Sequence, residues 1–128
     1  MAIDCSGDLK FNSGYGSAGT AYGCRAWVNF NGYGTLSIRG DGNVSSLTDN
    51  ASADYTINFS TSMPDVNYCA VFGFSEHDAG SANYVLGIKT DAPEGPAFTY
   101  STSALRVLAQ NGSGGNEELS YNCVAIFR

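Results

Sequence analysis

Short runs of alternating apolar and polar residues, separated by clusters of glycine, asparagine, aspartate and serine, dominate this chain. Residues 54–60 show the pattern most clearly. Tyr55, Ile57 and Phe59 share one face of an extended strand there, and polar residues share the other. No window places apolar residues at helical spacing between capping residues. The pattern predicts an all-β protein whose antiparallel sheets each have one buried and one wet face.

We predict an antiparallel, jelly-roll-like β-sandwich of eight or nine strands over residues 24–128, preceded by an extended glycine-rich arm over residues 1–23. The segments with a strand pattern are 24–30, 34–39, 44–48, 54–60, 66–74, 82–89, 97–101, 105–110 and 119–127. Asn31-Gly32 is the signal for a two-residue hairpin between the first two segments. The residues expected to face inward in that hairpin are Cys24, Ala26, Val28, Phe30, Leu36 and Ile38.

The aromatic residues divide into two groups. Those at strand-periodic positions are expected in the core or at a subunit interface, and they are Tyr55, Phe59, Tyr68, Phe72 and Phe127. Tyr15, Tyr22 and Tyr33 have glycine-rich surroundings and are either exposed for recognition or packed over a sheet edge. Segments 66–74 and 119–127 carry more apolar residues than one buried face needs, and this surplus is available to cover an interface.

The charge balance bears on the choice of partners. Twelve acidic and six basic residues give a net charge of −6. Such a chain is repelled by phosphate backbones and anionic membranes, so we expect no nucleic-acid partner and no membrane insertion. No apolar run is long enough to cross a bilayer, and residues 1–10 lack the pattern of a secretory signal. We therefore expect folding in a cytoplasm.

The four cysteines, Cys5, Cys24, Cys69 and Cys123, lack the paired spacing of a zinc site. An even count is compatible with two disulfides. The last three lie inside apolar strand patterns, where free cysteine behaves as a small hydrophobic residue. We expect reduced, buried cysteines, with a disulfide or zinc as alternatives.

No arrangement of catalytic residues is apparent in the sequence. The one histidine, His77, lies between Glu76 and Asp78, and consecutive loop residues rarely converge on one metal ion. Signatures of nucleophilic serine and of phosphate-binding loops are missing, and no carboxylate pair is singled out for glycoside hydrolysis. We therefore expect no enzyme activity, cofactor or metal, with a carbohydrate-active enzyme as the minor alternative.

The run Gly23-Cys24-Arg25-Ala26-Trp27-Val28-Asn29-Phe30-Asn31-Gly32 resembles the opening of a module common in tail-fibre and other virion proteins of marine phages, especially cyanophages. Further similar segments are 9–16, 36–39, 42–46, 48–50, 54–59, 63–68 and 124–128. The resemblance implies a β-sandwich displayed on the particle, often at the end of a long fibre and commonly as a homotrimer. It supplies no catalytic residues.

The resemblance thus implies a virion protein, assembled in the host cytoplasm beside other virion proteins, which binds a glycan or protein on the host surface. A capsid decoration protein is the alternative, since a short chain with a glycine-rich arm suits docking on a shell. Segment 74–118 resembles the family least, so its loops are the expected site of partner specificity. The candidate binding residues there are Glu76, His77, Asp78, Asn83, Asp91, Glu94, Asn111 and Asn116.

Overall fold

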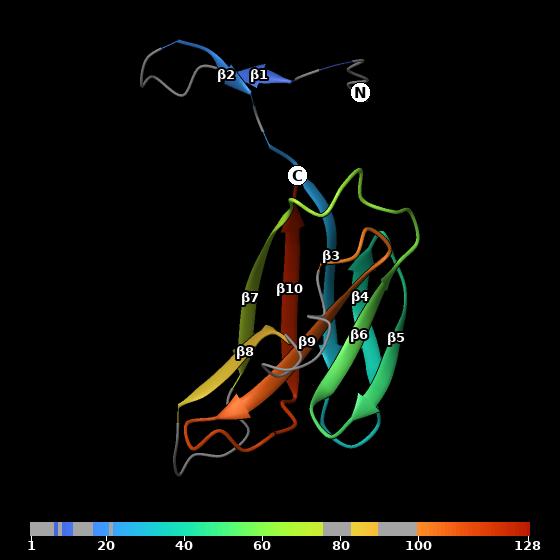
Figure 1. The fold of residues 1–128 in the computed structure, drawn as a ribbon, viewed down its shortest axis with the longest axis vertical. Helices are drawn as coiled ribbons and strands as arrows, with labels where there is room; N and C mark the ends of the chain where they lie inside the picture. The colour runs from blue at the N-terminus through green and yellow to red at the C-terminus, as the bar shows by residue number, and fades with distance from the viewer. Residues whose placement is uncertain (1–6, 8, 12–16, 21, 76–82, 90–99) are drawn as a thin grey trace.

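Two four-stranded sheets pack face to face in this computed structural model, which describes residues 7, 9–11, 17–20, 22–75, 83–89 and 100–128 (Figure 1). The predicted antiparallel β-sandwich is confirmed. The strands are β1 (Lys10–Phe11), β2 (Gly19–Thr20), β3 (Cys24–Asn31), β4 (Ser37–Gly42), β5 (Val44–Ala51), β6 (Asp54–Phe59), β7 (Cys69–Ser75), β8 (Tyr84–Ile88), β9 (Ala104–Asn111) and β10 (Tyr121–Phe127). Within segment 1–23, β1 and β2 form a short antiparallel pair.

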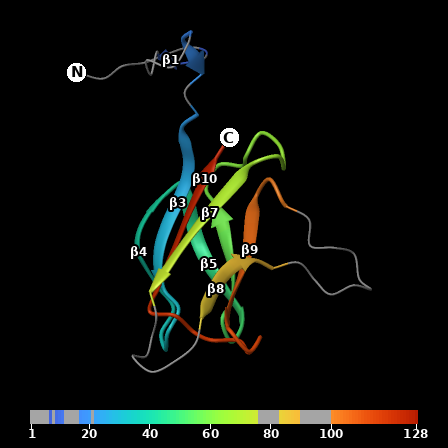
Figure 2. The ribbon, with the colours of Figure 1, turned by 90° about the vertical axis from the view of Figure 1, so that its left-hand side faces the viewer.

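The strand order brings the beginning and the end of the sandwich together. One sheet has the order β4-β3-β10-β7 and the other β5-β6-β9-β8, with every neighbouring pair antiparallel. Cys24 at the start of β3 pairs with Phe127 at the end of β10. We call this end of the sandwich the terminal end and the opposite one the loop end. Figure 2 shows the arm continuing beyond the terminal end.

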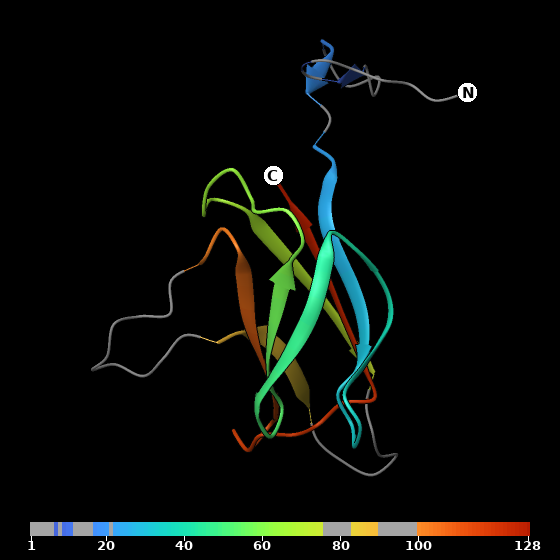
Figure 3. The same cartoon turned by 90° about the vertical axis from the view of Figure 1, so that its right-hand side faces the viewer.

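One asparagine carries the chain from the first sheet to the second. The chain passes directly from β4 into β5 (Figure 3). Asn43 lies between these strands with φ at 59°, a left-handed conformation that asparagine tolerates better than most residues. Its Nδ2 donates to the carbonyl oxygens of Arg25 and Thr61, at 3.1 and 3.0 Å. Its Oδ1 accepts the Thr61 backbone N–H at 2.8 Å. These bonds hold the corner in place.

The core lies between the sheets and follows the predicted alternation. Tyr55, Phe59 and Tyr68 are buried, Leu36 and Phe72 pack against the core, and Phe127 is 36% exposed. The buried hydrophobic residues are Ala26, Val28, Phe30, Val44, Ala53, Tyr55, Ile57, Phe59, Met63, Tyr68, Leu86, Leu105, Val107, Ala109, Leu119, Val124 and Ile126. Ile38 pairs with buried Phe30 but remains 36% exposed because β4 is an edge strand.

The inward position predicted for Cys24 is wrong. The pairing of β3 with β10 shifts at this point, since Ile126 pairs with Ala26 and Phe127 with Cys24. The extra residue, Arg25, interrupts the alternation as a β-bulge does. Cys24 is exposed as a result.

Two further expected strands differ from the structure in their bounds. Residues 66–68 precede β7 rather than forming part of it, and Asp65 instead accepts the backbone N–H of Asn67 at 2.7 Å. Of the expected strand 97–101, residues 97–99 lie outside the described part, and Tyr100 and Ser101 are not in a strand. The other expected strands are present within a few residues.

Asn31-Gly32 does not form the predicted two-residue hairpin, because residues 32–36 separate β3 from β4. Gly32 is held in the core instead. Its N–H donates to the carbonyl oxygen of Leu119 at 3.0 Å, and its carbonyl oxygen accepts the buried Tyr55 hydroxyl at 2.7 Å. A Cβ at position 32 would lie 2.7 Å from Tyr55 Oη, so the close approach requires glycine. Burial raises the pKa of Tyr55, which keeps its hydroxyl protonated as a donor.

This buried hydrogen bond generates a stability prediction. Tyr55→Phe should lower the free energy of unfolding by about 1–2 kcal/mol, because it leaves the Gly32 carbonyl without that donor. Tyr121→Phe is the control, since Tyr121 is 48% exposed and should change stability by no more than about 0.5 kcal/mol. Urea denaturation followed by fluorescence measures both. Equal stability of Tyr55→Phe and the wild type would contradict the role given to this bond.

Candidate functional site

Three of the eight candidate binding residues fall within the described part, and all three lie at the loop end. Asn83 directly precedes β8 and Asn111 ends β9, where Tyr84 pairs with Asn111 (Figure 1). A Cβ on the next residue, Gly112, would lie 3.2 Å from the Asn83 carbonyl oxygen. The structure therefore brings Asn83 and the loop after Asn111 together. Glu76, His77, Asp78, Asp91 and Glu94 lie outside the described residues.

Asn111 and Asn116 shape the loop that they flank. Asn111 Oδ1 accepts the backbone N–H groups of Ser113 and Gly115 at 3.1 and 3.0 Å. Asn116 Nδ2 donates to the carbonyl oxygen of Ser52 at 3.1 Å, which ties the loop to the turn between β5 and β6. Residues 112–116 are all exposed. The two asparagines therefore position an exposed, uncharged loop.

Tyr33 adds an aromatic side chain to the same end of the sandwich. It lies between β3 and β4 and is 51% exposed. Asn31 Nδ2 donates to the carbonyl oxygens of Tyr33 and Thr35 at 2.7 and 2.9 Å, which orders this connection. Tyr22, next to the terminal end, is 73% exposed. Of the two readings offered for these tyrosines, exposure is correct for Tyr22 and Tyr33, and Tyr15 lies outside the described residues.

The outer side of the β5-β6-β9-β8 sheet is a hydrogen-bonded polar surface, which we call the polar face. It carries Ser46, Thr48, Asn50, Asp54, Thr56, Asn58 and Arg106. Asn58 Nδ2 donates to Thr48 Oγ1 at 3.0 Å and to Ser46 Oγ at 3.1 Å. Asn50 Nδ2 donates to Thr56 Oγ1 at 2.9 Å. These side chains bond to one another across the strands, as expected for a surface in contact with water.

Asp54 is the one buried carboxylate among the described residues, with 1% of its surface exposed. Arg106 donates through Nε to Oδ1 at 2.7 Å and through Nη2 to Oδ2 at 2.8 Å, and Lys89 contacts Oδ2. Burial alone would raise the pKa of Asp54, but the hydrogen bonds and charges of Arg106 and Lys89 outweigh it and lower the pKa from 3.8 to about 2. A carboxylate enclosed in this way is a fixed ion pair, which suits a structural role rather than proton transfer.

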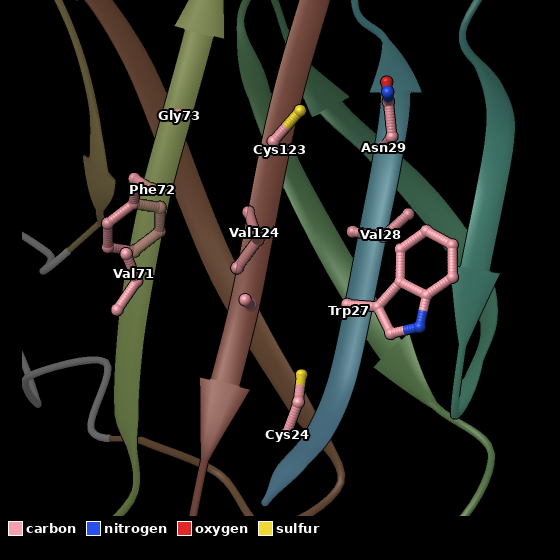
Figure 4. Close-up of a pocket in the computed structure, with 10 residues that line it drawn as sticks. Cys24, Trp27, Val28, Asn29, Val71, Phe72, Gly73, Cys123 and Val124 are labelled. Carbon is pink, nitrogen blue, oxygen red and sulfur yellow. The ribbon is translucent and has the colours of Figure 1, made fainter.

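The outer side of the β4-β3-β10-β7 sheet, which we call the apolar face, has a different character (Figure 4). Trp27, Ala125 and Val71 form one row across β3, β10 and β7, and Asn29, Cys123 and Gly73 form the next. Between them runs a groove of about 670 Å³. No single segment of the sequence indicated this groove, because the residues that line it come from strands far apart in the chain.

Trp27 is the largest side chain at the groove and is 46% exposed. Its indole lies towards β4, over Gly40 and Gly42. A Cβ on Gly40 would lie 3.3 Å from the indole, and one on Gly42 would overlap it. The two glycines therefore give the indole a flat bed on the edge strand.

All three described cysteines belong to this face. Cys24 and Cys69 each pair with Phe127, from opposite sides, and Cys123 lines the groove with Cys24. The three are free thiols. Cys24 and Cys69 are exposed and Cys123 is partly buried, so the prediction of buried cysteines is wrong for the first two. They occupy strands as predicted, but on the outer side. Cys5 lies outside the described residues.

Comparison with known proteins adds no assignment, since no family model, curated protein or solved structure matches the chain. In the described residues, no three side chains of histidine, cysteine, aspartate or glutamate are grouped so that they could hold a metal ion. The same residues include no helix with the length and apolar character needed to cross a membrane. The function of the chain therefore has to be inferred from the geometry of the loop end and of the two faces, together with the sequence resemblance.

The Asp54 ion pair generates a pH prediction. Because the folded pKa lies below that of an unfolded aspartate, the stabilisation is complete above about pH 4 and is lost as the pH falls towards 2. Asp54→Asn should lower the free energy of unfolding at pH 7 by about 2 kcal/mol or more. The difference from the wild type should shrink between pH 4 and pH 2, as measured by urea denaturation at each pH.

Asp65→Asn is the matched control. Asp65 also pairs with an arginine, Arg128, but both side chains are 38% exposed, so its replacement should have a much smaller effect. A difference between wild type and Asp54→Asn that stays constant from pH 7 to pH 2 would show that the carboxylate charge contributes nothing.

Proposed function

We propose that this chain is a non-catalytic module of the phage virion surface, of tail-fibre or tail-tip type, which attaches to a glycan or protein of the host cell. The sequence resemblance described above supports the virion assignment. The β-sandwich is compatible with it. The proposal includes contacts with other virion proteins and, as the resemblance implies, a homotrimeric assembly.

The observation that supports the attachment role is that the arm and the candidate binding residues lie at opposite ends of the sandwich. Both β3 and β10 reach the terminal end, where the arm leaves the sandwich (Figures 1 and 2). Asn83, the loop 112–116 and Tyr33 lie at the loop end. A module held by its arm therefore presents these residues away from the particle, where a host surface can be reached.

The chemistry of the loop end suits a neutral polar ligand. It offers exposed amide, hydroxyl and backbone groups in loop 112–116 and a half-exposed phenol at Tyr33. Tyrosine with serine, glycine and asparagine makes adaptable contacts with sugars and with protein surfaces. Each contact of this kind is weak, and the copies present on one particle multiply them.

A capsid decoration protein is the second candidate, and the apolar face is the observation that favours it. A shell of subunits would provide a surface against which Trp27, Val71 and their neighbours are covered. In that role the apolar face, and not the loop end, makes the contact that matters.

Binding of the purified chain to host cells separates the two candidates. The fluorescently labelled full chain should bind cells, and Tyr33→Ala should weaken binding about tenfold by removing an aromatic contact at the loop end. Tyr22→Ala is the matched control, an exposed tyrosine next to the terminal end, and should bind as the wild type does. Flow cytometry over a range of concentrations measures all three. Binding to empty capsids and not to cells would overturn the attachment role in favour of decoration.

A further inference from the structure

Arg39 lies at an irregularity of edge strand β4. Ile38 and Gly40 pair with adjacent residues of β3, so Arg39 between them is the extra residue of a β-bulge. A bulge redirects the side chain that it carries, and bulges are frequent beside functional sites. The guanidinium of Arg39 reaches the first residue of β10 at the loop end, where its Cζ lies 4.0 Å from the centre of the Tyr121 ring.

Hydrogen bonds fix the guanidinium over this ring. Its Nη1 donates to the Ser120 carbonyl oxygen, and its Nη2 donates to Asn31 Oδ1 at 3.3 Å. Asn31 in turn donates to the Tyr33 carbonyl oxygen at 2.7 Å, which links Arg39 to the connection between β3 and β4. These bonds use two of the five N–H donors of a guanidinium. The side chain is therefore already placed, and it keeps donors for a ligand.

The charge of Arg39 is not neutralised within the described part of the chain. Lys89, Arg106 and Arg128 each contact a carboxylate. The described partners of Arg39 are instead a carbonyl oxygen, an amide oxygen and the face of an aromatic ring. Arg39 is also exposed, so its positive charge is available to an anion.

We propose that Arg39, supported by Tyr121, binds the acidic group of a sugar on the host surface. The inference rests on the proposed attachment role and narrows the ligand of that role to an acidic sugar. The planar fork of a guanidinium matches the oxygens of a carboxylate or a phosphate. Tyr121 and Tyr33, which are 48% and 51% exposed at the same end, provide phenol groups for the sugar ring.

The surroundings of Arg39 favour a sugar over an acidic peptide. Ser37, Ser120 and Tyr121 carry hydroxyl groups close to Arg39 in the chain or in the contacts that it makes, and these groups match the hydroxyl groups of a sugar. A ligand with many anionic groups is repelled by a chain of net charge −6. The Glu118 carboxylate, which accepts the Gly34 N–H at 3.2 Å, adds to that repulsion at the loop end. An acidic sugar brings only one anionic group on each ring.

Titration of the full chain, followed by proton–nitrogen NMR spectra at constant ionic strength, tests the site directly. The Arg39 Nε resonance should shift with glucuronate or with glucose phosphorylated on its exocyclic hydroxyl, with half-saturation at about 1–10 mM. Glucose is the neutral counterpart and should cause no shift. The tighter of the two acidic sugars shows whether the group recognised is a carboxylate or a phosphate.

Two arginines allow a matched comparison, in which the backbone amide resonances of residues 120–122 report binding. Arg39 and Arg25 are exposed and belong to the same sheet, but Arg25 lies near the terminal end. Arg39→Gln should weaken binding of the acidic sugar about tenfold or more, because it removes charge-assisted hydrogen bonds. Arg25→Gln removes the same charge and should bind as the wild type does. Both variants should keep the circular dichroism spectrum of the wild type.

Four results would overturn the inference. The first is an unchanged Arg39 resonance with both acidic sugars up to about 100 mM. The second is equal affinity for acetate or inorganic phosphate, since the sugar then contributes nothing. The third is equal affinity for the acidic tripeptide glycyl-glutamyl-glycine, which would favour a peptide ligand. The fourth is equal weakening of binding by Arg39→Gln and Arg25→Gln.

Binding to host cells, measured separately, distinguishes failure of this inference from failure of the proposed function. A chain that binds the acidic sugar but no cells keeps the Arg39 site and loses the attachment role. A chain that binds cells but neither acidic sugar keeps the attachment role and loses the inference.

Discussion

The pairing of β3 with β10 is the constraint on which the rest of the structure depends. These strands open and close the sandwich, and they lie side by side at the centre of one sheet. Their inward side chains, such as Phe30 and Ile126, fill the core, and their outward ones, such as Trp27 and Ala125, make the apolar face. The same pairing places the arm at one end of the sandwich and the β3–β4 and β9–β10 connections at the other. The core, the apolar face and the separation of the two ends thus have one origin.

The outer sides of the two sheets carry different kinds of side chain. The β5-β6-β9-β8 sheet satisfies its polar side chains internally, and its buried carboxylate is neutralised by Arg106 and Lys89. The other sheet leaves Trp27 and Val71 half exposed over small residues. Contact with water is favourable for the hydrogen-bonding groups of the polar face and unfavourable for the exposed hydrophobic side chains of the apolar face. This asymmetry fits a module that is covered on one side and displayed at its loop end.

Local alternation in the sequence was enough to predict the sandwich and most of its core. Tyr55, Ile57 and Phe59 are buried as their spacing indicates. Features that depend on register were not predictable. The bulge opposite Phe127 turns Cys24 outward, and Asp54 meets Arg106 only because β6 pairs with β9. The apolar face left one trace, the surplus of apolar residues in β7 and β10, which is typical of strands covered on both sides. The candidate binding residues were chosen loop by loop, so the sequence did not indicate that Asn83 lies beside the loop after Asn111, and their role in binding stays a prediction.

Immunogold electron microscopy of intact virions that carry this chain tests the functional account most directly. An antibody against the folded chain reports where on the particle the module is displayed. The account predicts gold at the tail or at the fibre tips, where a loop end directed outward reaches the host. Gold spread over the head would contradict host attachment and make the chain a capsid decoration protein.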